Sequence, residues 1–308
     1  MSSSSVLIVG AGELGTAVIS ALLNHPQRDG GRIGVLRRAE TIESTDPAKQ
    51  AENTRLTSLG VQLEGGDFVS SPVTALASVF QKYDVVIQCG GFGLPAGTQL
   101  RVTDAVLQAR VKRYFPWQFG LDYPAIGEGS KQELFDEMLQ VRRRLADQNQ
   151  TAWTIMSTGL FMSFLFLPEF GVVDLENRVV RALGSWENQV TVTTPENIGT
   201  MVSEAVYVPE DTLNRVIYVA GETTSYQNLA DTLESCYSGE FQKELWDLET
   251  LSLQLERKPE DGMIKYRNVF GAGLGTAWDE KKTLNYERGI HLTKLQAYIN
   301  QHLQSHRD

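Results

Sequence analysis

The sequence contains little cysteine, fewer basic than acidic side chains, and no long hydrophobic run. Two cysteines, Cys89 and Cys236, are too few for a disulfide framework and form no Cys-x-x-Cys pair, which favours a reducing compartment. The 28 Lys and Arg against 38 Asp and Glu give a formal charge of −10, so nucleic acid is not expected as a partner. The most apolar stretch, residues 159–167, is far shorter than the roughly 20 residues that cross a bilayer, and the first residues show no secretory signal pattern. We therefore expect a cytoplasmic protein without a membrane segment.

Several catalytic motifs are also missing from the sequence. None of the ten tyrosines is followed four residues later by Lys, which excludes the Tyr-x-x-x-Lys pair of classical short-chain dehydrogenases. There is no His-Glu-x-x-His, and the four histidines lack zinc-ligand spacing, so we expect no metal site. A Gly-x-Ser-x-Gly nucleophile elbow is absent as well.

Strand-like and helix-like patterns alternate through the first half of the chain. Short apolar runs at residues 6–9, 32–36, 60–63, 84–88, 112–115 and 151–156 are separated by patterns of helical period. Such alternation is typical of an α/β fold with a doubly wound parallel sheet, the Rossmann architecture. We expect a first domain over residues 1–158, to which strands at about 189–220 return, and a smaller α/β lobe built mainly from residues 159–308.

A glycine-rich loop, Gly10-Ala-Gly12-Glu-Leu-Gly15, lies between the first apolar run and the first helical pattern. It matches the Gly-x-Gly-x-x-Gly pattern of dinucleotide sites, in the strand–loop–helix context that gives the pattern meaning. We expect Gly10 to allow the tight turn, Gly12 to let the backbone approach a pyrophosphate, and Gly15 to let the helix pack on the strand. The helix N-terminus, with Glu13 and Leu14, then faces the phosphates. The alternative is a glycine-rich turn without a ligand.

The end of the second apolar run indicates which dinucleotide binds. NAD sites usually carry an acid here for the ribose 2′-hydroxyl, whereas this run ends in Arg37 and Arg38, and the only nearby acid, Glu40, lies past it. Guanidinium groups match a 2′-phosphate. We therefore predict NADP(H), the alternative being a solvated basic pair. Residues 1–158 would then form an NADP-binding domain, and residues 159–308 would supply the substrate lobe.

Further cofactor contacts are expected where later strands end, because ligands of such sheets bind at the carboxyl ends of strands. The residues predicted there are Asp67 and Phe68 near the adenine, and Gln88, Cys89, Gly90 and Gly91 near the middle of the cofactor. The two glycines would permit close approach of the backbone.

The segment Lys112-Arg-Tyr-Phe-Pro-Trp-Gln-Phe-Gly-Leu-Asp122 carries a family resemblance. Together with the glycine loop, the arginine-ended strand, a helix containing Val-Arg-Arg and a Gly-Leu-Phe turn at 159–161, it resembles the isoflavone reductase-like and NmrA-like atypical short-chain dehydrogenases. The Pro-Trp-Gln-Phe-Gly version, with Ala-Leu-Gly-Ser-Trp186 downstream, is similar to the fungal isoflavone reductase-like branch. The resemblance covers most of the chain and becomes vague after Gly221.

The resemblance implies an NADP-binding doubly wound domain, with Gln118 and Phe119 also at the cofactor, and a smaller substrate lobe. Plant members reduce phenylpropanoids such as isoflavones, pinoresinol and phenylcoumarans, and NmrA itself is a dinucleotide-binding regulator without turnover. Fungal relatives belong to secondary-metabolite pathways, where some act as reductases and others use the cofactor to assist a cyclisation.

One position departs from the family pattern in a way that matters for catalysis. Matching the Val-Arg-Arg helix places Met138 where the plant reductases carry their catalytic Lys, and Met cannot donate a proton. Met138 also lies on the apolar stripe of its helix, so it is alternatively a core or pocket-wall residue. The candidate replacement acids are Lys131, Tyr123 and Asp122, with Lys265 and Tyr266 in the expected substrate lobe. Their alternatives are a solvated lysine, packing tyrosines and a turn residue.

Aromatic residues predict an apolar substrate pocket. Trp117 and Phe161 follow the ends of the expected fifth and sixth strands, and flat side chains suit an aromatic or polycyclic ligand. The predicted substrate residues are Trp117, Met138, Phe161, Phe164, Trp186 and Phe270. The alternative for each is ordinary core packing.

The sequence therefore predicts an NADP(H)-dependent oxidoreductase, monomeric or homodimeric. It would transfer a hydride to a C=C, C=N or C–O carbon of an aromatic or alkaloid-like small molecule. The missing Lys favours an iminium or quinone-methide-like acceptor, which needs less protonation than a ketone. Two alternatives keep the dinucleotide: a cyclase, of Diels–Alder or similar type, without net cofactor use, and an NmrA-type sensor without turnover. Residues 275–289 look like an organised motif, but none of these three interpretations gives it a role.

Overall fold

The computed structural model describes residues 4–302 and divides the chain into two compact units. Unit 1 comprises the described residues up to Gln118 together with Glu137–Met156 and Ile198–Ile217, and unit 2 comprises Phe119–Asp136, Ser157–Asn197 and the described residues from Tyr218 onwards. Among residues 4–302, no helix has the length and apolar character required to cross a membrane.

Unit 1 is built on a seven-stranded sheet in the order β11-β6-β5-β4-β1-β2-β3. The strands are β1 Val6–Val9, β2 Ile33–Arg37, β3 Gln62–Gly65, β4 Val85–Gln88, β5 Arg113–Phe115, β6 Ala152–Ser157 and β11 Arg215–Tyr218. Neighbouring strands from β1 to β6 pair in parallel, and the order reverses direction at β1, between β2 and β4. The doubly wound α/β fold predicted from the alternation is therefore confirmed.

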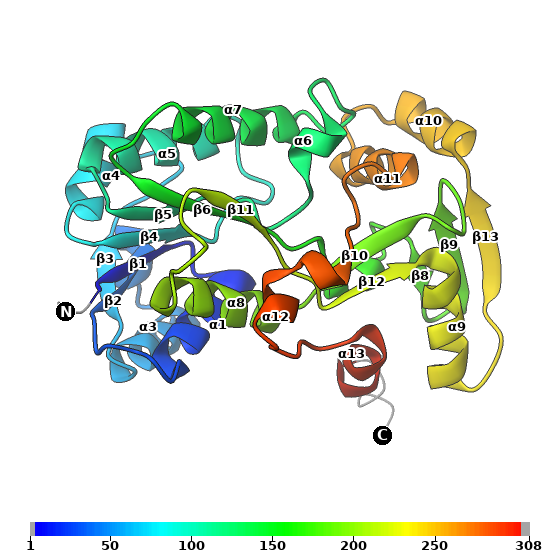
Figure 1. Cartoon of the computed structure of the whole chain (residues 1–308), viewed down its shortest axis with the longest axis horizontal. Helices are drawn as coiled ribbons and strands as arrows, with labels where there is room; N and C mark the ends of the chain where they lie inside the picture. The colour runs from blue at the N-terminus through cyan, green and yellow to red at the C-terminus, as the bar shows by residue number, and fades with distance from the viewer. Residues whose placement is uncertain (1–3, 303–308) are drawn as a thin grey trace. The chain divides into compact units, whose positions relative to one another are not determined.

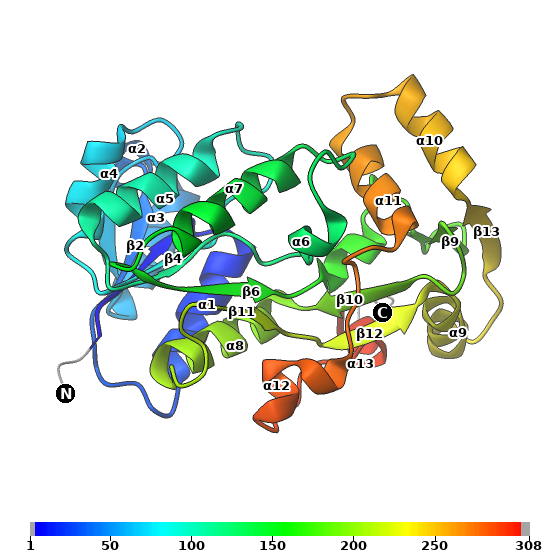
Figure 2. The same cartoon turned by 45° about the horizontal axis from the view of Figure 1, so that its top comes forward.

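Helices cover both faces of this sheet (Figure 1). They are α1 Glu13–Asn24, α2 Ala39–Ile42, α3 Pro47–Ser58, α4 Val73–Phe80, α5 Thr98–Ala109, α7 Leu134–Ala146 and α8 Pro195–Tyr207. Helices α4, α5 and α7 share one face, where their apolar side chains join those of the strands in one core, and α1, α3 and α8 lie on the other (Figures 1 and 2). Covering on both faces explains why a strand such as β1 is apolar at every position.

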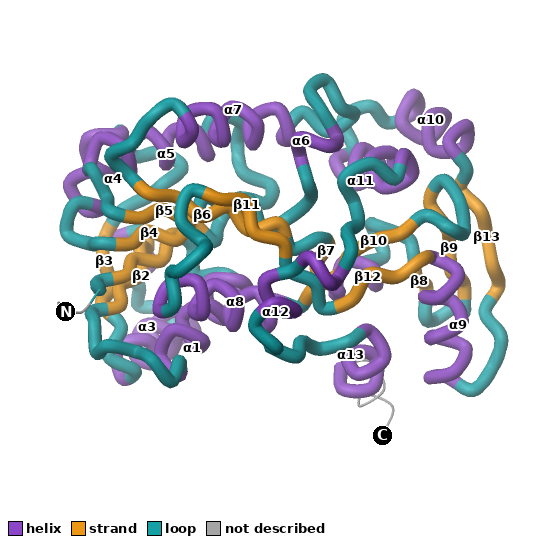
Figure 3. Tube along the Cα trace, viewed as in Figure 1, coloured by secondary structure: helices purple, strands orange, loops and turns teal. Residues whose placement is uncertain are grey.

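Unit 2 contains two three-stranded sheets, ordered β12-β10-β7 and β13-β9-β8 (Figure 3). Its strands are β7 Leu160–Phe161, β8 Val173–Asp174, β9 Val179–Leu183, β10 Gln189–Thr193, β12 Glu222–Ser225 and β13 Gln242–Trp246. Its helices are α6 Tyr123–Ile126, η1 Met162–Phe166, α9 Tyr226–Tyr237, α10 Leu248–Arg257, α11 Gly262–Ala272, η2 Glu280–Lys282, α12 Leu284–Glu287 and α13 Leu295–His302.

The expectation that strands at about 189–220 return to the first sheet is only partly correct. Strand β11 does join the seven-stranded sheet, but β10 pairs with β12 and β7 in unit 2. The chain leaves the first sheet at Gly159, which has φ +74° and whose absent Cβ would lie 2.0 Å from the carbonyl oxygen of Thr191. This close approach places β10 beside the segment that follows β6.

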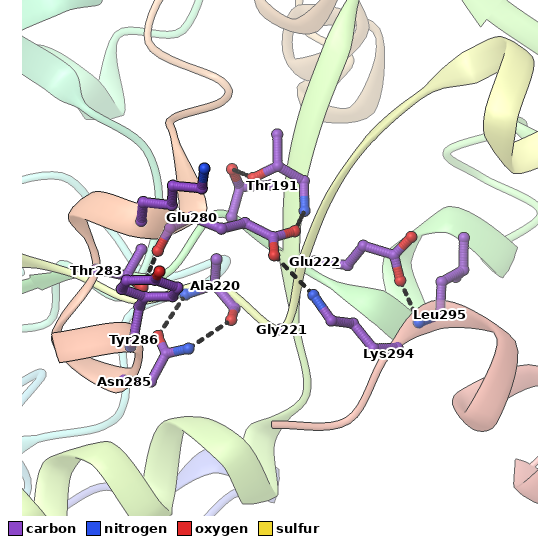
Figure 4. A network of polar contacts seen from close by, with 12 residues as sticks. Thr191, Ala220, Gly221, Glu222, Glu280, Thr283, Asn285, Tyr286, Lys294 and Leu295 are labelled. Carbon is purple, nitrogen blue, oxygen red and sulfur yellow. Dashed lines mark hydrogen bonds and ion pairs between the residues drawn. The ribbon is translucent and has the colours of Figure 1, made fainter. Parts of the chain in front are cut away.

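The motif at 275–289 belongs to a C-terminal strap, residues 275–295, which is bonded to the chain around β12 (Figure 4). The Asn285 side chain accepts a hydrogen bond from the N–H of Ala220 and donates one to its carbonyl, both at 3.1 Å. The Glu280 carboxylate accepts a bond of 2.7 Å from the N–H of Thr223. The strap thus satisfies backbone groups that the sheet leaves unpaired, which gives the motif a structural role.

Candidate cofactor site

The three glycines of the β1–α1 loop are glycines for different structural reasons. Gly10 has φ +100°, and a Cβ there would lie 2.6 Å from the backbone N of Gly90. A Cβ at Gly15 would lie 2.0 Å from the carbonyl oxygen of Gly10. Packing within the protein therefore requires both of these glycines. A Cβ at Gly12, in contrast, would meet no atom within 4 Å, so the open space there is available to a ligand.

The N-termini of α1 and α5 differ in what accepts hydrogen bonds from their free backbone N–H groups. Gly12 is the N-cap of α1 and offers no side-chain cap, so the positive end of this 12-residue helix is left for an external anion. At α5 the Glu137 carboxylate accepts backbone hydrogen bonds from Gly97 at 2.9 Å, Gln99 at 2.8 Å and Leu100 at 3.1 Å. That helix end already holds an anion of the protein itself, so of the two it is α1 that fits a phosphate group.

Two aromatic side chains lie against the glycines that follow β4. A Cβ at Gly90 would lie 2.8 Å from the ring of Phe68, and one at Gly91 would lie 2.0 Å from the indole of Trp117. Cys89, between β4 and these glycines, is buried, and burial raises the pKa of its thiol. The structure thus brings together these predicted residues of three loops, all in unit 1.

The side chain of Gln88 is engaged inside the protein. Its amide nitrogen donates to Gln99 Oε1 at 2.5 Å and to the carbonyl of Gly90 at 3.3 Å, and its oxygen accepts from the hydroxyl of Tyr114 at 2.5 Å. Gln88 is fully buried. We therefore interpret Gln88 as a residue that holds the Gly90–Gly91 loop, rather than as a side chain that contacts the cofactor.

Arg37, at the end of β2, is also held by its own protein. Its guanidinium donates to Asn53 Oδ1 at 2.8 Å and to Glu52 Oε2 at 2.5 Å, and the Arg37 side chain is only 9% exposed. Asn53 in turn donates to the carbonyls of Thr41 and Ile42 at the end of α2. Arg37 therefore joins β2, α2 and α3, and its charge is balanced before any ligand arrives.

The loop after β3 contains an acid that organises the loop itself. The Asp67 carboxylate accepts bonds from the N–H of Val69 at 2.9 Å and the hydroxyl of Ser70 at 2.7 Å. Burial alone would raise the pKa of Asp67, but these bonds and the charge of Arg38 outweigh it and hold the pKa below its usual value. Asp67 thus positions the following residue, Phe68, and Arg38 remains exposed beside it.

Gln118, in the loop after β5, is hydrogen-bonded to Met138 of α7. The Gln118 amide donates to the carbonyl of Met138 at 3.0 Å and accepts from Arg142 Nε at 2.6 Å. Both residues are buried, Met138 completely. The prediction that Met138 lines a substrate pocket is therefore not met in this structure, and the core interpretation fits its burial.

The chain is similar to known proteins over most of its length. The model of the NmrA-like family matches residues 2–275. This protein belongs to the NmrA-like family. An NmrA-like family domain-containing oxidoreductase of Gibberella moniliformis is 48% identical, over 96% of this chain and 97% of its own. Phenylcoumaran benzylic ether reductase 1 of Arabidopsis thaliana is 29% identical, over 73% of this chain and 71% of its own.

The fold of this NmrA-like protein is also found among solved structures. The structure "AtPrR2 with NADP+ and (+)pinoresinol" has a TM-score of 0.79 and 20% sequence identity, and the match covers 97% of this chain and 99% of that one. At this level of identity the likeness establishes the fold.

The candidate acids of this NmrA-like protein lie in unit 2, and two of them are engaged there. The Asp122 carboxylate accepts a bond of 2.8 Å from the hydroxyl of Tyr218, and its N–H donates to the carbonyl of Gly275 at 2.9 Å. Lys265 contacts both carboxylate oxygens of Glu133 at 2.8 and 2.9 Å, which raises the pKa of the lysine. Both residues therefore have structural partners.

The other candidate acids have different surroundings. Lys131 is exposed, as expected for a solvated lysine. Tyr123 is buried with its ring 4.9 Å from that of Phe135, which also contacts Tyr266 at 5.6 Å. Burial raises the pKa of the Tyr266 hydroxyl. A Cβ at Gly120 would lie 2.5 Å from the Tyr123 hydroxyl oxygen, so this tyrosine packs directly on the backbone.

The predicted aromatic residues of unit 2 divide into core and partly exposed groups. Phe270, expected at the substrate, is 2% exposed and packs edge-on against Phe170 at 5.7 Å, so it is a core residue. Phe119, expected at the cofactor, is also buried. Phe161, Phe164 and Trp186 are partly exposed, and the ring centroids of the two phenylalanines lie 6.2 Å apart. These three remain candidates for binding a ligand.

Two acids with clear roles at this site are not found by sequence reasoning. Glu137 caps α5 from a helix distant in sequence, and Glu52 neutralises Arg37. One signal for the first was present: Gly97, the residue before α5, has no side chain with which to cap the helix, so its first backbone N–H groups were open to another acceptor. No group of three or more His, Cys, Asp or Glu that could hold a metal occurs in the described part of the chain.

Proposed function

We propose that this protein is an NADP(H)-dependent reductase of a small aromatic or alkaloid-like molecule. The observation that carries the proposal is the β1–α1 loop, where open space at Gly12 lies at an uncapped helix N-terminus. Its two flanking glycines are explained by packing, whereas Gly12 is explained by a ligand that approaches the backbone. An oxidoreductase relative, a phenylcoumaran benzylic ether reductase relative and a similar fold crystallised with NADP+ support the assignment.

The residues present fit a phosphorylated dinucleotide. The N-terminus of α1 would bind the pyrophosphate through backbone N–H groups, Gly12 would admit it, and Arg38 would supply positive charge for the 2′-phosphate. Phe68 and Trp117 would offer flat apolar surfaces beside the Gly90–Gly91 backbone. When bound, the cofactor supplies or accepts a hydride, and the protein supplies orientation and exclusion of water.

A second candidate function is a redox-neutral cyclisation assisted by the same cofactor. It is favoured by the burial of Met138, whose side chain has no ionisable proton, and by the contacts of two candidate acids: Lys265 is paired with Glu133, and Asp122 accepts a bond from Tyr218. A reaction without net reduction needs no such proton donor. The same observation favours an iminium or quinone-methide-like acceptor within the reductase proposal, because these need less protonation than a ketone.

Binding of NADPH, NADP+, NADH and NAD+ to purified protein, measured by calorimetry, tests the proposal. Gly12→Val adds a side chain into open space, so the fold should persist while dinucleotide affinity falls at least about tenfold. Gly262→Val is the matched control, because a Cβ at Gly262 also meets no atom within 4 Å and the residue lies at the start of α11. It should leave affinity unchanged.

Equal affinity of the wild type and Gly12→Val would show that no ligand occupies the loop and would overturn the proposal. If binding is as expected, incubation with aromatic imines and quinone methides separates the two functions. A reductase consumes NADPH in proportion to product, whereas a cyclase forms an isomeric product without net consumption. Binding without either product would favour an NmrA-type sensor.

A further inference from the structure

The end of β2 presents two guanidinium groups in unequal states. Arg37 is 9% exposed and bonded to Glu52 and Asn53, whereas Arg38, the N-cap residue of α2, is exposed. The Arg37–Glu52 contact of 2.5 Å is a charge-assisted bond within the protein. A 2′-phosphate that recruited Arg37 would therefore have to compete with a carboxylate already in place.

Glu52 is not confined to the interior, since its side chain is 35% exposed while the guanidinium that it neutralises is nearly buried. A carboxylate at this end of β2 repels a phosphate and accepts a hydrogen bond from a free ribose hydroxyl. In this chain the carboxylate comes from α3 rather than from the end of the strand, which explains why the sequence pattern did not indicate it.

Asn53 shows that the arrangement is fixed by more than one ion pair. Its oxygen accepts from Arg37 and its nitrogen donates to the carbonyls of Thr41 and Ile42, and the residue is buried. Arg37 is thus held on two sides before the cofactor binds. The charge left accessible at the strand end belongs to Arg38.

We propose that Glu52 is a specificity-determining residue of the cofactor site: it neutralises Arg37, leaves Arg38 as the guanidinium that binds the 2′-phosphate, and so limits the preference for NADPH over NADH. The inference rests on the proposed function, because it requires a dinucleotide at this site. It assigns phosphate binding to Arg38 alone and none to Arg37, whereas a simple two-arginine phosphate site would assign it to both.

The test is the dissociation constant of NADH divided by that of NADPH, measured by calorimetry for the wild type and four variants. A higher ratio means a stronger preference for NADPH. Glu52→Gln releases Arg37 and should raise the ratio about 5- to 10-fold, the size of one partly exposed charge-assisted bond. Arg38→Met should lower the ratio at least about tenfold. The double variant Arg37→Met with Glu52→Gln should keep the wild-type ratio within about threefold, because a balanced pair is removed. Glu249→Gln, an exposed acid in the first turn of α10, is the charge-matched control and should change nothing.

A lower ratio in Glu52→Gln would mean that Glu52 orients Arg37 toward the phosphate, and it would overturn the proposal. A double variant that loses NADPH preference as completely as Arg38→Met would overturn it as well. Both outcomes leave dinucleotide binding by the wild type intact, so they are distinct from failure of the proposed function, in which the wild type binds neither NADPH nor NADH.

Discussion

Glu137→Gln should destabilise the protein locally at the start of α5. The buried carboxylate accepts from Gln99 and Leu100 with one oxygen and from Gly97 with the other. An amide can replace only one oxygen, so at least one bond is lost and an NH2 group is turned toward a backbone N–H. A bond to a charged acceptor contributes about 1.5–3 kcal/mol, and loss of the negative charge at a helix N-terminus adds about 0.3–1 kcal/mol. We expect a loss of about 2–4 kcal/mol.

Urea unfolding measures the total loss, and hydrogen exchange of residues 97–100 locates it. If the loss is confined to the opening of the first turn of α5, these amides should exchange roughly 30- to 700-fold faster, since each 1.4 kcal/mol is tenfold. Glu133→Gln is the control: this carboxylate is 72% exposed, and the amide oxygen of Gln remains an acceptor for Lys265, which is 11% exposed, so the substitution should cost less than about 1 kcal/mol. A loss below about 0.5 kcal/mol in Glu137→Gln, with unchanged exchange, would refute the capping role.

Three further predictions concern unit 1. Burial alone would raise the pKa of Asp84, but bonds from Lys112 and from a serine lower it to about 2. The Asp84 carboxylate therefore stabilises the folded state fully at a pH above its unfolded pKa of about 4. This stabilisation is lost as the pH falls toward 2. The difference in unfolding free energy between wild type and Asp84→Asn should accordingly shrink between pH 4 and 2, and a constant difference would contradict it. Arg113→Met should cost about 2–4 kcal/mol in urea unfolding, because the buried guanidinium donates to three acceptors; a cost near zero would show that these acceptors find other partners. Gly91→Ala should displace the Trp117 indole and cost about 1–3 kcal/mol, seen in melting temperature and tryptophan fluorescence, and an unchanged spectrum would argue against their contact.

Local rules predicted much of the fold and the frame of the site. Apolar runs of four to six residues and helical periods gave the order of strands and helices, because burial on both faces makes a central strand such as β1 apolar at every position. The positive φ of Gly10 and the contact of Gly15 with the Gly10 carbonyl oxygen are local features that the glycine pattern predicts, whereas the close approach of Gly10 to Gly90 is a tertiary contact that it does not. The alternation alone was sufficient for the parallel sheet.

Partners from distant parts of the chain could not be predicted in the same way. Periodicity identifies β10 as a strand but does not predict its sheet, which is known only from its pairing with β7 and β12. The identity of Arg37 suggested a phosphate ligand, whereas its partner on α3 is visible only in three dimensions. Residue type determines which interactions a side chain can make, and tertiary contacts determine whether another residue of the protein already makes them.

The C-terminal strap has a consequence for the edge of the β12-β10-β7 sheet. Strand β12 is an edge strand, and such an edge is a template for unwanted pairing. Glu280 occupies the N–H of Thr223 on this edge, and Asn285 occupies both backbone groups of Ala220 just before it. The family match ends at residue 275, so the residues that block this edge lie beyond it. A chain shortened to the family segment would keep its glycine loop but expose a bare edge, and we expect it to aggregate where the full chain does not.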